Sequence, residues 1–502
     1  MSKVVDIYLP LDERPACNDT VWPVALKQLK ELVSVIEKCG WSANVLNPDK
    51  PVSRVVEGIR LARKSRGERF INFMAGWCYP DFSVTPMAQL PVALPKLMLG
   101  SAISDFPGAV GLFAAQSGTA HVGMKVDRLF AENFSDHSEY QDGVAEFLKN
   151  GSYERKMETP IEIAVTDKHR AAAKKVRDAL RGQIYGCVGP RSMQMWNKIS
   201  EADFLSVFGV AKESFDQLRL VKMAEKVPDA RAEAAMKFLI DNGMDLRLGT
   251  DPQKFLTKDM VIYQMKMYFA LLELKAQYGL DFCGVQDQLD LIEHYSSTDL
   301  TLGILNNRLR PESDGETFVA STEADDGAAV TMQVLKLLSG GEPAGFNDLR
   351  YWKLKGNLYW FVNSGALAPY FAEGIHTSLK GSWSERQNLM YHRNGGGVCS
   401  VVVRKPGVVT WARFSYRNHQ MYLCAGRGVT DVPTQEQWQE RSARCSQDWP
   451  QWYLKLCGRP EWKINTNHPM TVCGDYLAEL KALADELKVP FECYDHCTPD
   501  TL

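Results

Sequence analysis

The first part of the chain alternates short apolar runs with stretches in which apolar residues recur at helical spacing. Val4–Leu9, Phe70–Ala75 and Ala109–Ala115 have the length and composition of buried strands. After the first run, Asn18-Asp-Thr offers caps for a helix with one apolar face that ends near Gly40. Strands that alternate with helices in this way predict a parallel sheet with helices on both faces.

The same alternation starts again near Arg181. Two further strands and three helices are expected, at Leu280–Val285 and Thr317–Ser321 and at Ala230–Asn242, Lys258–Tyr278 and Gly327–Leu338. The last helix is closed by a glycine pair, as is typical of helix ends. This stretch predicts a second α/β unit.

From about residue 343 the pattern changes to short β-rich runs separated by Gly, Pro and Asn. The runs are Leu358–Val362, Gly397–Lys405, Val408–Tyr416 and Gln420–Cys424, and a helix at Asp475–Leu487 follows them. We therefore expect an α/β protein of three domains, since a chain of 502 residues exceeds one hydrophobic core. These are two Rossmann-like α/β domains, 1–180 and 181–342, and a mainly antiparallel, barrel-like β domain, 343–502.

Composition excludes several partner classes. Formal net charge is -3, from 58 basic and 61 acidic residues, so no excess of charge favours nucleic acid or an anionic membrane as a partner. No apolar stretch reaches 18 residues, and the apolar run at the start is too short for a signal peptide and contains Asp6. We expect a cytoplasmic protein whose 12 cysteines, which include no C-x-x-C pair, are mostly small buried hydrophobes.

Three polar residues lie at strand ends or beside turns, where ligands bind in open α/β sheets. Glu323 ends an apolar strand before a helix, Asp348 follows that helix and a Gly-rich turn, and His468 comes shortly before the last helix. Two carboxylates and an imidazole suit Mn²⁺, Mg²⁺ or Co²⁺ with open positions for oxygen ligands. Such an ion can hold two adjacent sugar oxygens as a Lewis acid, while a carboxylate moves protons.

Each of the three also has an ordinary structural explanation. Glu323 could cap the helix or pair with a cation, Asp348 could form a local turn pair with Arg350, and His468 could be a hydrogen-bonded surface or core histidine. Spacing alone leaves both interpretations open.

A series of short blocks occurs in order along the chain: Gly284-Val-Gln-Asp-Gln288, Phe318-Val-Ala-Ser-Thr-Glu-Ala-Asp325, Asp348-Leu-Arg-Tyr-Trp352, Val362-Asn-Ser-Gly365, Tyr391-His-Arg-Asn-Gly-Gly-Gly397, Asp448-Trp-Pro450 and Thr466-Asn-His468. Weaker blocks are Asp12-Glu-Arg-Pro15 and Trp77-Cys-Tyr79. Together they resemble the L-fucose isomerase family, within the wider fucose/arabinose isomerase group. The resemblance covers nearly the whole chain and is densest between residues 280 and 475.

The resemblance implies a metal-dependent aldose–ketose isomerase that works through a cis-enediol intermediate. Glu323, Asp348 and His468 would ligate the catalytic metal, typically Mn²⁺, and the two carboxylates would shuttle a proton between C1 and C2. The implied sugar-binding residues are Arg14, Trp77, Gln286, Ser364, Tyr391, Trp449 and Asn467. The family is oligomeric, commonly hexameric, with sites at subunit contacts, and Trp77 matches an aromatic that reaches the pocket from a neighbouring subunit.

These sugar-binding assignments compete with ordinary ones. Trp449 and Tyr391 could be core aromatics, Gln286 and Asn467 could satisfy backbone groups in turns, and Arg14 could pair with an adjacent carboxylate.

The substrate is left open by departures from the family pattern, at 289–295 and at Pro469 after the histidine. L-Fucose, D-arabinose, L-arabinose and sulfoquinovose all fit the group. A sulfonate would need fixed cations or backbone N–H donors, and Arg14, Lys125 and Arg393 are available as cations. Two other classes stay possible: a non-catalytic sugar-binding or sensing protein, and another metal-assisted sugar enzyme such as an aldolase or epimerase.

Overall fold

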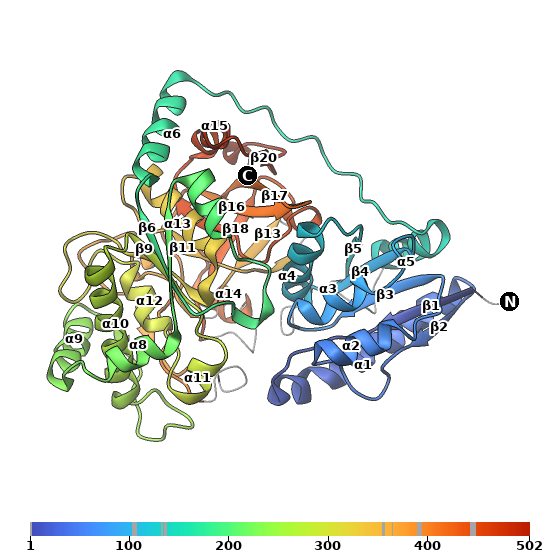
Figure 1. Cartoon of the computed structure of the whole chain (residues 1–502), viewed down its shortest axis with the longest axis horizontal. Coiled ribbons are helices and arrows are strands. Elements are labelled where there is room, and N and C mark those ends of the chain that lie inside the picture. Colours follow the sequence, from blue (N-terminus) through green and yellow to red (C-terminus); the bar gives the residue numbers. More distant parts are fainter. Residues whose placement is uncertain are drawn as a thin grey trace.

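The computed structural model describes residues 3–102, 108–131, 134, 138–353, 357–363, 365–388, 394–441 and 448–502. Two parallel sheets lie on either side of a larger, mainly antiparallel sheet (Figure 1). This arrangement confirms the predicted fold class: two α/β units followed by a curled, half-barrel β region. The proposed domain limits remain a prediction. Within the described residues, no helix combines the length and apolar character needed to cross a membrane.

The N-terminal sheet has the strand order β2-β1-β3-β4-β5 and is parallel throughout. Its strands are β1 (Lys3–Tyr8), β2 (Trp41–Val45), β3 (Arg69–Met74), β4 (Lys96–Ser101) and β5 (Asp127–Ala131). Its helices are α1 (Pro15–Lys38), α2 (Val55–Ala62), α3 (Asp81–Ala88), α4 (Gly108–His121) and α5 (Ser138–Asn150). The strand order reverses between β1 and β3, and Arg14 and Trp77 follow these two strands. Both therefore lie where open α/β sheets bind ligands.

One strand prediction in this region is wrong: Ala109–Ala115 belongs to helix α4. Nearly every residue of α4 is buried, so its apolar residues show no helical period and cannot be told from a strand. Two glycines let the helix pack closely. A Cβ at Gly108 would lie 1.8 Å from the Met74 carbonyl oxygen, and one at Gly111 would lie 3.1 Å from the Cys78 nitrogen.

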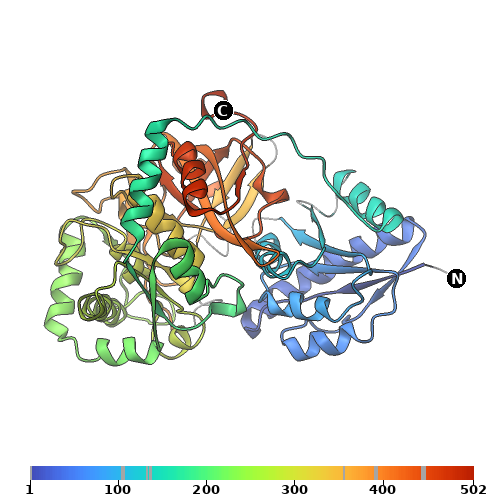
Figure 2. The same cartoon turned by 45° about the horizontal axis from the view of Figure 1, so that its top comes forward.

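Residues 151–166 form a long connection without helix or strand that crosses from α5 to α6 (Asp167–Leu180), as Figures 1 and 2 show. The second sheet follows, with the parallel order β10-β9-β6-β7. Its strands are β6 (Ile184–Val188), β7 (Ala211–Phe215), β9 (Phe282–Val285) and β10 (Val319–Ser321). The predicted helices correspond to α9 (Asp229–Asp241), α10 (Lys258–Tyr278) and α13 (Asp326–Leu338). The order reverses between β6 and β9, directly before Gln286.

The C-terminal sheet has the order β11-β19-β16-β17-β18-β13-β12, with β20 beside β17. Its strands are β11 (Gly345–Phe346), β12 (Leu349–Lys353), β13 (Leu358–Phe361), β16 (Val408–Arg417), β17 (Gln420–Thr430), β18 (Trp452–Leu456), β19 (Met470–Cys473) and β20 (Phe491–Cys493). All its pairs are antiparallel except β17 with β20. The predicted run Gly397–Lys405 contributes only β15 (Ser400–Val401), which joins β14 (Ser382–Ser384) and β8 (Asp245–Leu246) in a small separate sheet.

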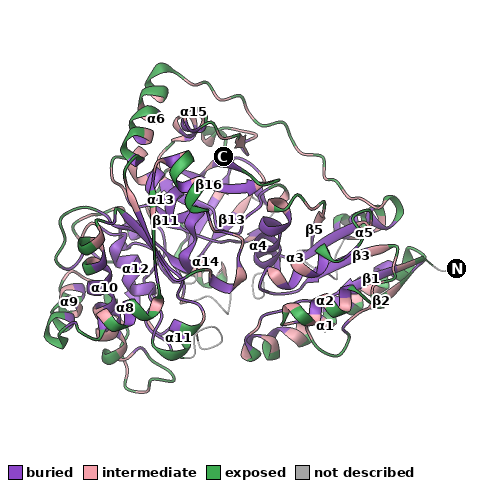
Figure 3. Cartoon of the chain, in the orientation of Figure 1, coloured by how far each residue is buried: buried purple, intermediate pink, exposed green. Residues whose placement is uncertain are grey.

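Two of the hydrophobic clusters each contain buried residues from two different sheets. One buried cluster joins α4 and the N-terminal sheet to aromatic residues of the C-terminal sheet, and a second joins the second sheet to the C-terminal sheet through α13. The first ten residues of α13 are all buried, and Figure 3 shows this helix within the buried interior. The N-terminus of α13 is thereby held against the C-terminal sheet, which positions the site described next.

Candidate functional site

Three separate segments bring Glu323, Asp348 and His468 together. Glu323 follows β10, Asp348 lies between β11 and β12, and His468 lies just before β19. Strands β11 and β19 are antiparallel neighbours with Phe346 opposite Met470, which sets the last two segments side by side. The first segment joins them because α13, which begins after Glu323, packs on β19 and β16.

The three side chains converge on one imidazole nitrogen. Nε2 of His468 lies 3.2 Å from Oε2 of Glu323 and 3.3 Å from Oδ1 of Asp348. All three residues are buried, with 5%, 6% and 1% exposure for Glu323, Asp348 and His468. The side-chain amide of Asn467 donates a hydrogen bond of 3.0 Å to the same Asp348 oxygen. The structure therefore brings the three predicted residues together, and their role as metal ligands stays a prediction.

Burial and charge act in opposite directions on these groups. Burial raises the pKa of Glu323; His468 opposes this shift, and the nearby carboxylates of Asp348 and Asp325 add to it. Burial alone would lower the pKa of His468, but the surrounding carboxylates of Asp348, Asp325 and Glu323 raise it well above its ordinary value. The site is thus a dry cluster of negative groups around a single imidazole, which favours a bound cation.

The backbone at Glu323 is strained. Glu323 and Ala324 have φ angles of 61° and 44°, in the left-handed region that residues with a side chain seldom adopt. Each such residue costs roughly 1–2 kcal/mol and persists only when the surroundings hold it. Strain of this kind clusters at functional sites. The turn also explains why Glu323 does not cap α13: the cap is Asp325, whose Oδ1 accepts from the Ala328 N–H at 2.7 Å.

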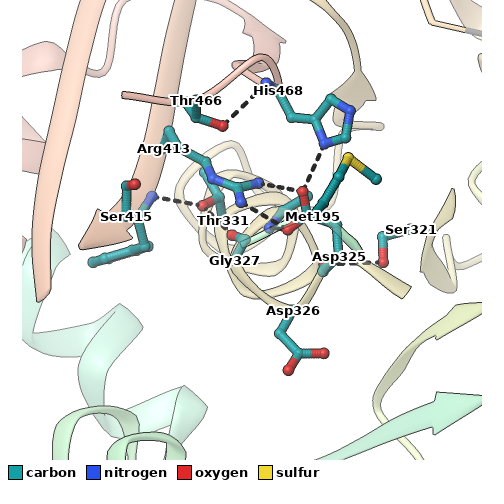
Figure 4. A network of polar contacts seen from close by, with 12 residues as sticks. Met195, Ser321, Asp325, Asp326, Gly327, Thr331, Arg413, Ser415, Thr466 and His468 are labelled. Carbon is teal, nitrogen blue, oxygen red and sulfur yellow. Dashed lines mark hydrogen bonds and ion pairs between the residues drawn. The ribbon is translucent and has the colours of Figure 1, made fainter. Parts of the chain in front are cut away.

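Sequence reasoning missed two residues of the site, Asp325 and Arg413. Oδ2 of Asp325 lies 2.7 Å from Nδ1 of His468, and the Arg413 guanidinium lies 2.8–2.9 Å from both Asp325 oxygens (Figure 4). Burial would raise the pKa of Asp325, but Arg413 and His468 hold it well below its usual range. Asp325 ends the segment Phe318–Asp325 that resembles the family, but nothing in the sequence indicated that Arg413, 88 residues later, would pair with it.

Arg14 and Gln286 lie on the facing ends of the two parallel sheets. Nη1 of Arg14 donates to Oε1 of Gln288 at 3.0 Å, and the Gln286 side chain donates to the Gln288 carbonyl at 3.0 Å. Oε1 of Gln286 is buried and receives no hydrogen bond from any described residue. Arg14 also pairs with Asp12, as the ordinary interpretation expects, but this pair is buried rather than on the surface.

The two predicted tryptophans have different surroundings. Trp77 is half-buried and packs in a cluster with Met195 and Leu289 of the same chain; Met195 in turn contacts the Asn467 amide at 4.0 Å. Trp449 is buried, and its Nε1 donates to Oε1 of Gln387 at 3.1 Å. Its core-aromatic interpretation holds in part, because it belongs to a small buried aromatic cluster. Ser364 and Tyr391 lie outside the described residues.

The donor set suits a divalent cation. Two carboxylates and an imidazole are ligands for Mn²⁺, Mg²⁺ or Co²⁺, and Oε2 of Glu323 is a buried oxygen that no hydrogen bond of good geometry satisfies within the described residues. The residues therefore fit a cation chemically. Within the described parts of the chain, however, no group of three or more His, Cys, Asp or Glu residues is already arranged to hold a metal ion.

Comparison with known proteins gives consistent matches. The model of the first N-terminal domain of L-fucose isomerase matches residues 6–158. The L-fucose isomerase of Bacteroides fragilis is 24% identical, in an alignment covering 88% of this chain and 84% of the relative. That of Bacteroides thetaiotaomicron is 24% identical over 92% of this chain and 88% of the relative, and that of Haemophilus influenzae 20% identical over 88% and 83%.

Proposed function

The chain belongs to the L-fucose isomerase family, and on that premise we propose that this aldose–ketose isomerase uses one divalent cation, Mn²⁺ or a similar ion, bound by Glu323, Asp348 and His468. The observation that carries the proposal is the convergence of two buried carboxylates, from segments far apart in the sequence, on Nε2 of His468 at 3.2 and 3.3 Å. A cation bound there would act as a Lewis acid on two adjacent sugar oxygens.

Proton transfer is assigned to the same two carboxylates. An aldose becomes a ketose when the C2 proton moves to C1 through a cis-enediol and the O2 hydroxyl proton is passed to O1. This needs a general acid–base group beside these atoms, a role that a carboxylate can fill. Glu323 and Asp348 flank one imidazole, and burial keeps water from exchanging freely with the transferred proton. Asn467, which donates to Asp348, would hold that carboxylate in place.

The sugar is proposed to lie between this cluster and the C-terminal ends of the two parallel sheets. Gln286 offers an unsatisfied buried acceptor there, while Arg14, Trp77 and Trp449 supply polar and aromatic groups around it. Ser364 and Tyr391 stay assigned by resemblance alone. Homo-oligomerisation, with sites at subunit contacts, is likewise part of the proposal.

A neutral sugar of the L-fucose or D-arabinose type is favoured over sulfoquinovose. A sulfonate is best held by a cation whose charge is not already paired, yet the Arg14 charge is matched by Asp12 at 2.6 Å. Lys125 is exposed in the turn before β5, at the opposite end of the N-terminal sheet from Arg14. Arg393 lies outside the described residues.

A product screen by NMR tests the proposal. Protein loaded with Mn²⁺ is incubated in D₂O with L-fucose, D-arabinose, L-arabinose and sulfoquinovose, beside a chelated sample to which Mn²⁺ is later restored. We expect metal-dependent ketose from L-fucose or D-arabinose, with deuterium at C1 or C2 wherever the transferred proton exchanges. Turnover that survives exhaustive chelation would contradict the metal assignment. Tight metal binding without any ketose product would instead favour another metal-assisted sugar reaction.

A further inference from the structure

Asp325 contacts the face of His468 that points away from Glu323 and Asp348. Its Oδ2 lies 2.7 Å from Nδ1, whereas both other carboxylates lie at Nε2. Asp325 is fully buried, and Arg413, which is 2% exposed, places Nη1 2.9 Å from Oδ2 and Nη2 2.8 Å from Oδ1 (Figure 4). The three side chains therefore form a line from β16 through the start of α13 to the imidazole.

We propose that the Asp325–Arg413 pair positions His468 by fixing its tautomer and ring orientation, so that Nε2 is the nitrogen presented to the cation. The inference rests on the proposed function. A carboxylate that already accepts from a guanidinium can only accept from Nδ1, so Nδ1 carries a hydrogen and Nε2 is left to ligate. Hydrogen bonds from a carboxylate to the far nitrogen of a ligating histidine both orient it and make it a better ligand.

Arg413 supplies what Asp325 needs to remain an anion in the interior. A buried carboxylate without a partner is costly, and the planar guanidinium fork matches both of its oxygens. The Arg413 guanidinium can approach α13 closely because residue 327 is glycine. A Cβ at Gly327 would lie 2.8 Å from Nη2 of Arg413 and 2.8 Å from the Phe414 carbonyl oxygen. A side chain at Gly327 would therefore push the guanidinium away from Asp325.

The next residue provides a matched control. Asp326 is also fully buried and also paired with cations, Lys198 at 2.6 Å and Lys212 at 2.7 Å. Its carboxylate points away from His468 in Figure 4, towards the second sheet, where it accepts from Tyr185. Loss of its charge should weaken the fold in much the same way, without touching the imidazole.

The test measures Mn²⁺ affinity of the full-length protein from the electron paramagnetic resonance signal of unbound Mn²⁺. The Asp325→Asn amide keeps an oxygen for the Ala328 N–H but can turn its NH₂ towards Nδ1, which moves the imidazole hydrogen to Nε2. We expect the Mn²⁺ Kd to rise about 10- to 100-fold, as for other partners of ligating histidines, with the sugar KM at saturating Mn²⁺ little changed. Asp326→Asn should stay within about twofold of the unmodified protein.

Two variants of Arg413 test the same contact from its other side, in case Asp325→Asn does not fold. Arg413→Lys keeps a cation opposite Asp325 but loses the fork, and should raise the Kd about three- to tenfold, whereas Arg413→Met should raise it more. Circular dichroism and thermal unfolding identify variants that fold. An unchanged Kd in folded Asp325→Asn or Arg413→Met, or an equal loss in Asp326→Asn, would overturn the inference.

The His468→Gln variant distinguishes failure of the proposed cation site from failure of the positioning role. If His468→Gln leaves Mn²⁺ affinity unchanged, the cation site itself is wrong and both ideas fall together. If His468→Gln weakens binding strongly while Asp325→Asn does not, only the positioning role is overturned.

Discussion

Arg14 forms a buried charge pair that also links the two parallel sheets, so its replacement should destabilise the protein in addition to any effect on the sugar. Its Nη2 lies 2.6 Å from Oδ2 of Asp12, with the two side chains only 9% and 3% exposed. Its Nε lies 3.0 Å from the other Asp12 oxygen, and Nη1 donates to Gln288 across the gap between the sheets. A surface pair would contribute little, whereas a buried pair is sensitive to the loss of one partner.

The size of the effect follows from what each variant leaves behind. Arg14→Met strands the Asp12 carboxylate in the interior, which costs about 3–5 kcal/mol, and removes one further hydrogen bond worth about 1 kcal/mol. For a cooperative unit of about 150–250 residues, 1 kcal/mol shifts Tm by roughly 2–4 °C, so a loss of about 4–6 kcal/mol should lower Tm by roughly 8–24 °C. Arg14→Lys keeps the charge and loses only the fork, and should cost about 1–2 kcal/mol.

Thermal unfolding at fixed protein and metal concentrations measures these shifts. Combining Asp12→Asn with Arg14→Met removes both charges and should restore much of the lost stability, which gives a coupling energy of about 1–3 kcal/mol. If Arg14→Met lowers Tm by less than 2 °C, the reasoning about the buried pair is refuted. Initial rates of Arg14→Lys then isolate the sugar: an unchanged kcat/KM would leave Arg14 with a structural role alone.

Three other predictions are simpler. Glu323→Gln and Asp348→Asn should each lower turnover by about 10²–10⁴-fold in a ketose assay while the protein remains folded, and activity within tenfold of the parent would remove them from the proton-transfer step. Burial raises the pKa of Asp448 to about 7, so its stabilising contribution is present below about pH 4 and is lost as the pH rises through 7. Asp448→Asn should therefore be more stable than the parent by up to roughly 4 kcal/mol at pH 8 and equally stable at pH 4, as pH-dependent unfolding would measure; equal stability at pH 8 would contradict this. Light scattering should give the mass of two or more 56.4 kDa chains. The mass of a single chain would instead remove subunit contacts from the proposed site.

Local sequence pattern predicted elements well where the pattern was unambiguous. The helices at 229–241, 258–278 and 326–338 follow from long stretches with apolar residues or clear end signals, and β16 from a β-rich run. It failed at α4, where burial on all sides removes the period that distinguishes a helix from a strand. It also did not single out β4 (Lys96–Ser101), which lies fully buried beside β3.

For the site, the sequence identified residues but not their surroundings. Glu323, Asp348 and His468 were found through strand-end positions and resemblance, and the structure brings them together. Asp325 and Arg413 were missed because their pairing depends on how α13 packs against β16, which no local pattern encodes. Partners of site residues that come from a distant strand are therefore the part that needs a structure.

Three carboxylates occur within four residues, Glu323, Asp325 and Asp326, and the strained turn explains how each reaches a different partner. If α13 began directly after β10, helical spacing would place Glu323 and Asp326 on the same face of the helix and Asp325 on another. The left-handed φ angles at Glu323 and Ala324 instead break the chain direction before the helix starts. Glu323 can then face Nε2 of His468 while Asp325 caps α13 and reaches Nδ1, and Asp326 turns to the lysines of the second sheet. The roughly 2–4 kcal/mol of backbone strain persists because the buried contacts around the turn hold it in place, and the strained turn is in turn what directs the three carboxylates to different partners.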